Sequence, residues 1–334
     1  MKVLMISGDP GVLDLKSDVG KRMAEYRAVL GGLDILLACG NIFNFISGFF
    51  RGLKLMRNRY DIITAQDMEH SLLAWVFSKL FKIPWQMQIH SDIFSPYFQT
   101  ESFKNKLRVR LAKFLVPRAD CIRVVSERIK NSLTAYGVKH ITVLPIFVDT
   151  EKIKNVLIKT DLHKKYPGRF VILMASRVTK EKNIGLAVEA MKELVTLPLL
   201  LIVGDGPELE SLKFKVKSEK LEGNIKFEPY TEDLASYYKT CDLFLLASYY
   251  EGYGRTLIEA VAAGAKVISS DVGIAPEILE PENIFKVGNK NDLKEKIVAA
   301  LNQKLPAPKP LVSQTKGEYL RLYKRSFEIC VNKK

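Results

Sequence analysis

Hydrophobic residues in this chain gather in short runs that alternate with longer segments of mixed polarity. Nearly unbroken runs of Val, Ile and Leu are typical of strands that are buried on both faces, as in a parallel sheet covered by helices. One series of runs fills the first half of the chain, and a second series follows it. The predicted strands are residues 3–7, 33–38, 62–65, 85–89, 121–125 and 142–145, and then 170–175, 199–203, 225–228, 243–247, 266–270 and 284–287.

The segments between these runs carry the periodicity of amphipathic helices, as Leu72, Val76 and Leu80 illustrate. Two series of alternating strands and helices predict two doubly wound, Rossmann-like α/β domains, which we expect to face each other across a cleft. Ligands bind beyond the carboxyl ends of parallel strands. A cleft between two such domains therefore suits a reaction that joins two substrates.

A Lys-rich, turn-forming stretch at residues 148–168 indicates the domain boundary. We expect an N-terminal domain over residues 1–150 and a C-terminal domain over residues 151–312. The Pro-rich residues 305–310 break helix and predict an extended connector. A helical apolar stripe follows in residues 313–334, and we expect that last helix to pack back on the N-terminal domain.

The length of 334 residues also favours two domains, and the composition is ordinary for a globular protein. The formal charge of +14 is uneven, because residues 1–160 hold 24 Lys/Arg against 14 Asp/Glu, a net of +10. A charge concentrated in one half suggests an anionic partner for that half. Phospholipid headgroups, lipid phosphates and nucleic acid all qualify, and a merely solubilising surface remains the alternative.

The four cysteines, Cys39, Cys121, Cys241 and Cys330, lie far apart in the sequence without a CxxC pair. Their spacing predicts neither a disulfide framework nor a metal site, and it fits small buried residues in a reducing compartment. No signal-peptide pattern opens the chain, and no apolar stretch approaches the ~18 residues that span a bilayer. We therefore expect a cytoplasmic protein whose contact with the cell membrane is peripheral.

The most informative segment is residues 242–264, where a buried strand ends near Ser248 and a helix begins near Arg255. The glycine-containing loop between them lets backbone amides at the helix N-terminus approach a phosphate. Glu251 stands in this loop and Glu259 follows eight residues later on the helix, so two carboxylates can contact the two ends of one ligand. The alternative is that Glu259 only complements the helix dipole and Glu251 is solvated.

Two cations follow another predicted strand end, in the segment Ser176-Arg177-Val-Thr-Lys-Glu-Lys182-Asn183. Departure of a nucleoside diphosphate concentrates negative charge, and fixed cations beside it lower the barrier. Placed on the same rim as Glu251, Arg177 and Lys182 fit this role better than that of solvated surface charges.

Four weaker candidates complete the set. Gly204, in a tight turn closed by Pro207, is more readily a structural residue than a nucleotide contact. His90 follows a strand and can bind a sugar hydroxyl, organise an acceptor or serve structure alone. The four His residues offer no metal site by their spacing. Gly11 lies in a strand-end loop that can approach a substrate, and Arg22 on the next helix is a weak candidate for phosphate binding.

Residues 103–118 contain six Lys/Arg and no acidic residue. We expect their apolar stripe to pack into the domain while the cations meet anionic lipid, each contributing about 1 kcal/mol. The alternative is a solvated cationic face. The predicted stripe is Phe103, Leu107, Leu111, Phe114 and Leu115, and a second candidate contact comprises Phe45, Phe49, Phe50, Leu53 and Met56 with Arg51, Lys54, Arg57 and Arg59.

Taken together, these segments resemble the family 4 (group 1) retaining glycosyltransferases of the GT-B fold over nearly the whole chain. Glu251 and Glu259 match the family's Glu-x7-Glu motif, and residues 176–183 match its diphosphate-binding segment. Gly204-Asp-Gly-Pro207 and Val125-Ser126 agree in order and context. The sequence departs from the family pattern at three places. Gly8–Gly11 lacks the usual paired glycines, and residues 143–149 lack the common Asn-Gly. Pro229 stands where a glycine often follows the strand.

The resemblance implies the role of each site residue. Arg177 and Lys182 would hold the diphosphate of a UDP-, GDP- or ADP-sugar, Glu251 the sugar hydroxyls, and Glu259 the ribose. His90 matches a histidine near the donor sugar. The other donor contacts expected are Gly252, Tyr253, Gly254, Arg255, Thr256, Gly204 and Gly11.

The resemblance also implies the reaction. The family works without a catalytic metal or other cofactor, and it retains anomeric configuration, with the leaving phosphate helping to deprotonate the acceptor. The N-terminal domain would lie on the acceptor side, and the acceptor would be a glycan or a lipid-linked molecule in cell-surface polysaccharide or glycolipid assembly.

Three other classes of protein share some of these features. A nucleotide-sugar epimerase of the same architecture would convert donor without an acceptor. A basic nucleic-acid-binding protein is disfavoured, since no recognised nucleic-acid-binding motif is present and the basic residues lie away from the predicted site. A dinucleotide oxidoreductase would need a phosphate fingerprint that neither domain begins with.

Overall fold

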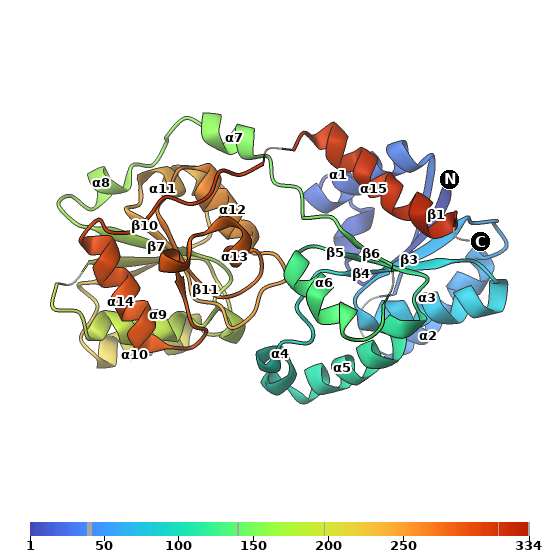
Figure 1. Ribbon diagram of the computed structural model, residues 1–334, viewed down its shortest axis with the longest axis horizontal. Helices are drawn as coiled ribbons and strands as arrows, with labels where there is room; N and C mark the ends of the chain where they lie inside the picture. The colour runs from blue at the N-terminus through green and yellow to red at the C-terminus, as the bar shows by residue number, and fades with distance from the viewer. Residues whose placement is uncertain (39–41, 139, 197, 313, 333–334) are drawn as a thin grey trace. The chain divides into compact units, whose positions relative to one another are not determined.

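The computed structural model describes residues 1–38, 42–138, 140–196, 198–312 and 314–332. The chain divides into two compact units (Figure 1). Unit 1 comprises Met1–Phe147 together with Gln314–Lys334, and unit 2 comprises Val148–Ser313.

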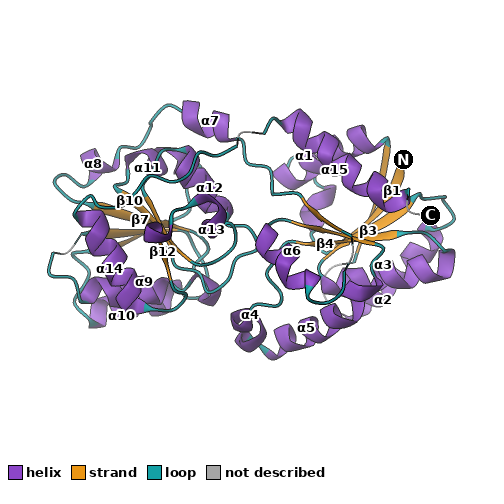
Figure 2. Cartoon of the chain, in the orientation of Figure 1, coloured by secondary structure: helices purple, strands orange, loops and turns teal. Residues whose placement is uncertain are grey.

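Within the described residues, unit 1 holds a six-stranded sheet in the order β2-β1-β3-β4-β5-β6, and every neighbouring pair is parallel (Figure 2). The order changes direction at the neighbours β1 and β3, with β2 beyond β1. The strands are β1 (Lys2–Ser7), β2 (Gly32–Leu37), β3 (Ile62–Gln66), β4 (Trp85–Ile89), β5 (Cys121–Val124) and β6 (Ile141–Val143).

Helices cover both faces of this sheet. In Figure 1, α1 and α15 lie over one face, and α2, α3 and α5 lie over the other. The helices are α1 (Asp18–Leu30), α2 (Ile42–Leu55), α3 (Met68–Phe81), α4 (Pro96–Glu101), α5 (Phe103–Leu115), α6 (Glu127–Thr134) and α15 (Lys316–Val331), with the 3₁₀ turns η1 (Pro10–Leu13) and η2 (Val116–Arg118).

The last helix, α15, is fixed to unit 1 by buried polar contacts as well as by apolar packing. Thr315 and Glu318 form a reciprocal capping box at its start. Its Tyr323 ring stacks on Tyr26 of α1 with centroids 4.0 Å apart. The buried Arg123 of β5 donates hydrogen bonds to the Tyr319 hydroxyl (3.1 Å) and to the Leu144 carbonyl (3.2 Å).

The prediction that the cysteines form no disulfide is wrong. Cys121 of β5 and Cys330 of α15 form one, with Cα atoms 5.7 Å apart across a sequence separation of 209. Cys241 is free, and Cys39 lies outside the described residues. The spacing of the cysteines along the chain could not predict this pair, because the two residues meet only when α15 packs back on β5. The cysteine pattern therefore no longer supports a reducing compartment.

Unit 2 repeats this architecture with a different strand order. Within its described residues a six-stranded parallel sheet has the order β12-β11-β10-β7-β8-β9. The strands are β7 (Val171–Ala175), β8 (Leu199–Val203), β9 (Ile225–Glu228), β10 (Leu243–Leu246), β11 (Val267–Ser270) and β12 (Ile284–Phe285).

Its main hydrophobic core includes Ile172 of β7, Ile202 of β8 and Leu245 of β10, all nearly inaccessible to solvent. Helices cover the sheet on both sides (Figure 2). They are α7 (Thr150–Asn155), α8 (Leu162–Lys165), α9 (Ile184–Lys192), α10 (Leu209–Ser218), α11 (Leu234–Thr240), α12 (Arg255–Ala262), α13 (Ala275–Ile278) and α14 (Lys290–Leu301), with the 3₁₀ turns η3 (Lys180–Lys182) and η4 (Pro281–Asn283).

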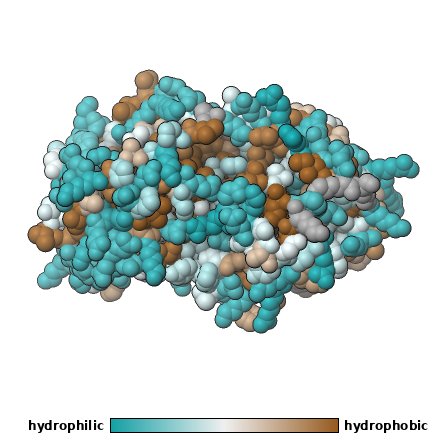
Figure 3. Space-filling view, in the orientation of Figure 1, coloured by the Kyte–Doolittle hydropathy of each residue, from teal (hydrophilic) through white to brown (hydrophobic). Residues whose placement is uncertain are grey.

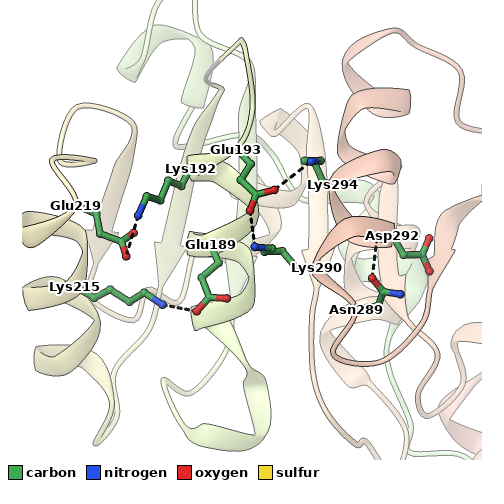
Figure 4. A network of polar contacts seen from close by, with 9 residues as sticks. All are labelled: Glu189, Lys192, Glu193, Lys215, Glu219, Asn289, Lys290, Asp292 and Lys294. Carbon is green, nitrogen blue, oxygen red and sulfur yellow. Dashed lines mark hydrogen bonds and ion pairs between the residues drawn. The ribbon is translucent and has the colours of Figure 1, made fainter.

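Surface ion pairs link the helices of unit 2 on the outside of this core. Glu193, directly after α9, pairs with Lys290 and Lys294 of α14 (Figure 4). Because such exposed pairs are worth little individually, the buried apolar layer carries most of the stability.

The predicted fold class is confirmed, since both sheets are parallel and covered by helices. All twelve predicted strands appear in the structure, each within two residues of the predicted ends. They were predictable because strands buried on both faces, such as β4, β7 and β8, leave a continuous apolar run in the sequence.

The predicted orientation of α5 is wrong for most of its stripe, although Leu115 is buried as predicted. Its buried face is formed by Asn105, Val109, Ala112 and Leu115, spaced as one side of a helix. Phe103 and Leu107, expected to pack inward, are 79% and 56% exposed. The sequence offered two apolar stripes, and the one with smaller side chains lies against the unit.

The second predicted contact, on α2, is also only partly exposed. Met56 is buried and Phe49 stacks on Phe77 of α3, whereas Phe50 is 64% exposed. Phe43 and Ile46, which the prediction omitted, share the exposed side with Phe50. Among the described residues, no helix is long and apolar enough to cross a membrane.

Candidate active site

The strand order of unit 2 identifies where a ligand should bind. β7 and β10 are neighbours at the point where the order changes direction, with β8 on the other side of β7. Loops that leave such neighbouring strands in opposite directions open a crevice at their carboxyl ends. The segment that contains Arg177 and Lys182 follows β7, and the segment that contains Glu251 follows β10.

Lys182 and Glu251 meet directly at this position. The Lys182 Nζ and Glu251 Oε1 atoms are 2.5 Å apart, and both side chains are largely shielded, with exposures of 16% and 14%. The Ser248 hydroxyl donates a second hydrogen bond to the same carboxylate oxygen (2.8 Å). A backbone hydrogen bond from the Tyr249 amide to the Glu181 carbonyl ties the two loops together. The structure thus brings together two residues 69 positions apart.

Arg177 occupies the same loop but is far more exposed. Its side chain is 76% exposed, and its guanidinium forms an ion pair with Glu181 at 3.1 Å. The side chain is therefore less constrained than that of Lys182, and it can reorient without breaking a buried contact.

Helix α12 begins beside Glu251 without a side-chain cap. Its N-cap is Gly254, whose φ of 94° lies in the left-handed region that glycine adopts without strain. Gly252, Tyr253 and Gly254 are buried, while Arg255 is exposed and Thr256 is intermediate. These residues form a loop and first helical turn of the kind that holds phosphate groups.

Glu259 projects from the second turn of α12. Its carboxylate accepts hydrogen bonds from Arg255 Nε (2.8 Å) and from the Tyr238 hydroxyl (3.3 Å) of α11. The pKa of Tyr238 is raised by burial and by the neighbouring Glu259 charge, so the hydroxyl keeps its proton and donates. These contacts fix Glu259 in place, with 14% of its side chain exposed.

Gly204 has a clear structural role. A Cβ atom at Gly204 would lie 2.0 Å from the Ser176 carbonyl oxygen, and one at Gly206 would lie 2.3 Å from that of Val178. The turn after β8 therefore packs backbone to backbone against the turn after β7, which no larger residue allows. This contact supports the shape of the loop that carries Arg177.

Three weaker candidates lie in unit 1. Gly11 stands in η1, where its amide binds the Asp9 carboxylate (2.8 Å), and Arg22 is exposed on α1. His90 follows β4, and its Nε2 atom is buried without a hydrogen-bond partner among the described residues. Burial first, and then the charges of Arg123 and Arg22, lower the pKa of His90 to about 3, so the ring is neutral.

Several residues of these sites escaped the sequence analysis. Ser248 was recognised only as the end of a buried strand, and its hydrogen bond to Glu251 was not predicted. Tyr238 could not have been predicted, because only a tertiary contact connects it to Glu259. Glu181 lies four residues from Arg177 in the same loop, so its opposite charge could have been noticed. Within the described residues, no group of three or more His, Cys, Asp or Glu side chains is placed to hold a metal ion.

Two family profiles match the sequence. The profile described as "Glycosyl transferases group 1" matches residues 158–317, and "Glycosyltransferase Family 4" matches residues 22–152.

Curated relatives match over part of their length. Alpha-monoglucosyldiacylglycerol synthase of Streptococcus pneumoniae is 27% identical over 241 residues, 66% of this chain and 54% of the relative. UDP-Gal:alpha-D-GlcNAc-diphosphoundecaprenol alpha-1,3-galactosyltransferase of Escherichia coli is 26% identical over 236 residues, 65% of this chain and 59% of the relative. The chain thus spans little more than half the length of these two relatives.

Solved structures match over nearly the whole chain. Anabaena HepE in complex with UDP aligns with a TM-score of 0.69 and 19% identity, covering 99% of this chain and 95% of that one. Sucrose-phosphate synthase of Thermosynechococcus elongatus aligns with a TM-score of 0.76 and 20% identity, covering 99% and 94%. At these identities the likeness shows a shared fold.

Proposed function

The chain belongs to the group 1, family 4 glycosyltransferases, and from that premise we propose that it transfers a sugar from a nucleotide-sugar donor to a glycan or lipid-linked acceptor. The observation that carries the proposal is the meeting of Lys182 and Glu251 where the strand order of unit 2 changes direction. These are the cation and the carboxylate that the family motif assigns to the two ends of the scissile bond.

The chemistry follows from their charges. When the bond between the anomeric carbon and the diphosphate breaks, negative charge grows on the leaving group and Lys182, Arg177 and the first turn of α12 stabilise it. Glu251 accepts hydrogen bonds from donor-sugar hydroxyls, and Glu259 from the ribose. The departing phosphate takes the proton of the acceptor hydroxyl as that oxygen bonds to the anomeric carbon, so configuration is retained.

The printed names of similar proteins support the substrate classes. Solved structures of HepE hold UDP or UDP-glucose, which favours UDP among the three bases considered. The S. pneumoniae relative is named for a glycolipid product, and the E. coli relative for a diphosphoundecaprenol-linked acceptor. We propose an acceptor of this kind, in cell-surface polysaccharide or glycolipid assembly.

We propose further that the protein works at the cytoplasmic face of the membrane, bound to anionic lipid rather than nucleic acid. Exposed Phe43 and Phe50 of α2 and Phe103 and Leu107 of α5 support this, because aromatic residues beside lysines and arginines suit a lipid interface.

The first test concerns the donor. In a panel of UDP-, GDP- and ADP-sugars, the sugars of one nucleotide should raise the melting temperature of the wild-type protein. Lys182→Ala should lower kcat about 100-fold or more, since losing a contact to developing charge costs on the order of 3–4 kcal/mol. Lys290→Ala, which removes an exposed cation paired with Glu193, is the matched control and should leave kcat unchanged.

Two results would refute the proposal. One is normal turnover by the Arg177→Ala/Lys182→Ala protein with its fold intact by circular dichroism. The other is conversion of the donor sugar to an epimer in the absence of any acceptor, which is the behaviour of an epimerase.

A further inference from the structure

A small cavity in unit 1 lies at the carboxyl ends of β3 and β4. It has a volume of about 50 Å³, room for a few hydroxyl-bearing atoms rather than for a nucleotide. Its polar walls come from Asp67 and Glu69 where α3 begins, His90 after β4, and Arg108 of α5. Phe98 of α4 contributes an apolar wall.

Two buried polar atoms at this cavity have no hydrogen-bond partner among the residues that the structure describes. They are Nε2 of His90 and Oε2 of Glu69. Buried polar groups are nearly always paired, because leaving one unpaired costs about 1–3 kcal/mol. Both atoms belong to residues that line the same cavity, so a ligand there is a candidate partner for each of them.

Glu69 is held for such a role by Arg108. The Arg108 Nε atom donates a hydrogen bond to Glu69 Oε1 at 2.7 Å, which leaves Oε2 as the unpaired oxygen. Burial is the largest single influence and opposes ionisation of this carboxyl, but the hydrogen bond and charge of Arg108, a backbone hydrogen bond and the charge of Lys104 together lower the pKa of Glu69. Glu69 is therefore an anion whose second oxygen can only accept hydrogen bonds.

Asp67 adds a second carboxylate and a strained backbone. Its φ of 64° and ψ of 163° place it in a region that almost only glycine occupies. It stands at the N-cap of α3, yet its side chain makes no capping hydrogen bond. An aspartate kept under strain without its usual local bond suggests that the carboxylate serves something outside the helix.

We propose that this cavity receives hydroxyl groups of an uncharged polyol portion of the acceptor, such as a neutral pyranose or a glycerol group; this inference rests on the proposed function. Glu69 Oε2 and the Asp67 carboxylate accept hydrogen bonds from hydroxyl hydrogens. The Nε2 atom of the neutral His90 ring forms a hydrogen bond with the same polyol. Glu69 is then a specificity-determining residue, and Arg108 is the residue that positions it.

The charges that line the cavity favour an uncharged polyol over an anionic group as its ligand. Asp67 and Glu69 face the cavity, and the one cation that lines it, Arg108, already pairs with Glu69. A carboxylate or phosphate entering here would meet two like charges at short range, where the repulsion is weakly screened. A hydroxyl carries no charge to be repelled, and it gains hydrogen bonds to the charged carboxylates, which are the stronger kind.

The experiment uses the full chain with UDP present and two probes that differ only in charge. Methyl α-D-glucopyranoside and the methyl glycoside of glucuronic acid are titrated by saturation-transfer-difference NMR. The wild-type protein should bind the glucoside at least about tenfold more tightly than the glucuronide. Glu69→Gln should weaken glucoside binding about five- to tenfold, because a neutral amide replaces a charged acceptor, and should narrow the preference between the probes.

The controls separate a binding role from a structural one. Glu193→Gln removes a carboxylate from an ion pair in unit 2 and should bind both probes like the wild type. Arg108→Ala should weaken glucoside binding, and Arg108→Lys should restore part of it by returning a cation. Melting temperature and stabilisation by the nucleotide are measured for every variant to confirm that the fold is intact.

The outcomes are distinct. If glucuronide binds as well as glucoside, or if Glu69→Gln binds glucoside like the wild type, the inference is overturned. If nucleotide stabilises the wild type but no glucoside signal appears, the inference also falls while the proposed function stands. If glucoside binds but no nucleotide sugar does, the proposed function falls.

Discussion

At the scale of the residue, the pair formed by Lys182 and Glu251 must open for the proposed reaction to begin. Each is the other's partner in this structure, and each is shielded from water. A charge left alone in such surroundings is costly, so donor binding has to supply the diphosphate to Lys182 and sugar hydroxyls to Glu251 together. Replacement of the Lys182–Glu251 contact by contacts to the donor favours a molecule that carries both a diphosphate and a sugar. Free phosphate or free sugar would satisfy only one of the two residues.

The residue scale also provides a test of strain at Asp67. Ala is ordinarily the more stabilising residue by about 0.4–1 kcal/mol when it replaces Gly at an unstrained position. At the φ and ψ of Asp67 the order should reverse, since strain of about 1–3 kcal/mol burdens any residue with a Cβ atom. We expect Asp67→Gly to have a higher free energy of unfolding than Asp67→Ala, by about 1–2 kcal/mol in urea denaturation.

Both variants lack the carboxylate, so the comparison isolates the backbone. Equal stabilities, or a more stable Ala variant, would mean that Asp67 is not strained in solution.

Individual residues were predictable where a motif fixes their spacing, as at Glu251 and Glu259. They were not where three-dimensional contact alone defines them. Asp67 and Glu69 stand together at the start of α3, but Arg108 of α5 lies 39 positions after Glu69, and nothing in that separation relates the two. The direction change between β1 and β3 could have drawn attention to Asp67, had the strand order been known.

At the scale of the element, strands were far easier to predict than helix orientations. A strand buried on both faces can be placed without knowing which side is which. A helix such as α5 has to present one side to the protein, and Phe103 and Leu107 outweigh Val109 and Ala112 in hydrophobicity. The structure nevertheless buries the smaller residues, because small side chains let the helix approach the rest of the unit closely.

The attachment of α15 is the second element whose chemistry can be tested. Cys330→Ala should lower the free energy of unfolding by about 2–5 kcal/mol, since the disulfide with Cys121 closes a long loop in the unfolded chain. Dithiothreitol should lower the stability of the wild type by a similar amount and should leave Cys330→Ala unaffected.

Cys241→Ala is the matched control, because that thiol is free and its loss should preserve the sensitivity to dithiothreitol. Alkylation of the denatured, unreduced protein at Cys121 and Cys330 would contradict the disulfide. The same assay on protein taken from its cell reports on the proposed cytoplasmic location, where thiols are kept reduced.

At the scale of the whole molecule, the positive charge is concentrated in one of the two units. The strongly basic first half of the chain supplies nearly all of unit 1, and the more balanced second half supplies unit 2. Sequence alone predicted this asymmetry and an anionic partner. It could not show which aromatic residues accompany the cations, because that depends on how α2 and α5 are turned.

Helices α2, α3 and α5 form one outer layer of unit 1, joined by ring contacts between Phe49 and Phe77 and between Trp75 and Phe114. We call the exposed hydrophobic residues of this layer the aromatic surface. The face of the molecule drawn in Figure 3 carries hydrophobic patches among hydrophilic residues. The aromatic surface comprises Phe43, Ile46 and Phe50 of α2, Leu80 and Phe81 of α3, and Phe103, Leu107 and Phe114 of α5.

The aromatic surface should bind lipid through two separable contributions. Lysines and arginines of α5 attract anionic headgroups over about a Debye length, and the aromatic side chains then enter the interface. Replacing Phe50 and Phe103 by Ser should lower the partition coefficient onto vesicles of anionic phosphatidylglycerol and phosphatidylcholine by about tenfold or more, measured by sedimentation. Binding by the wild type should weaken as salt rises.

Unit 2 supplies the matched control, because Phe214 on α10 is 75% exposed, close to the 79% of Phe103, but lies outside this surface. Phe214→Ser should bind vesicles like the wild type if the location of the aromatic residue matters. An equal loss in Phe214→Ser would indicate nonspecific hydrophobic adsorption. Equal binding of the wild type to purely neutral vesicles would remove the electrostatic contribution, and with it the reason for concentrating the positive charge of the chain in unit 1.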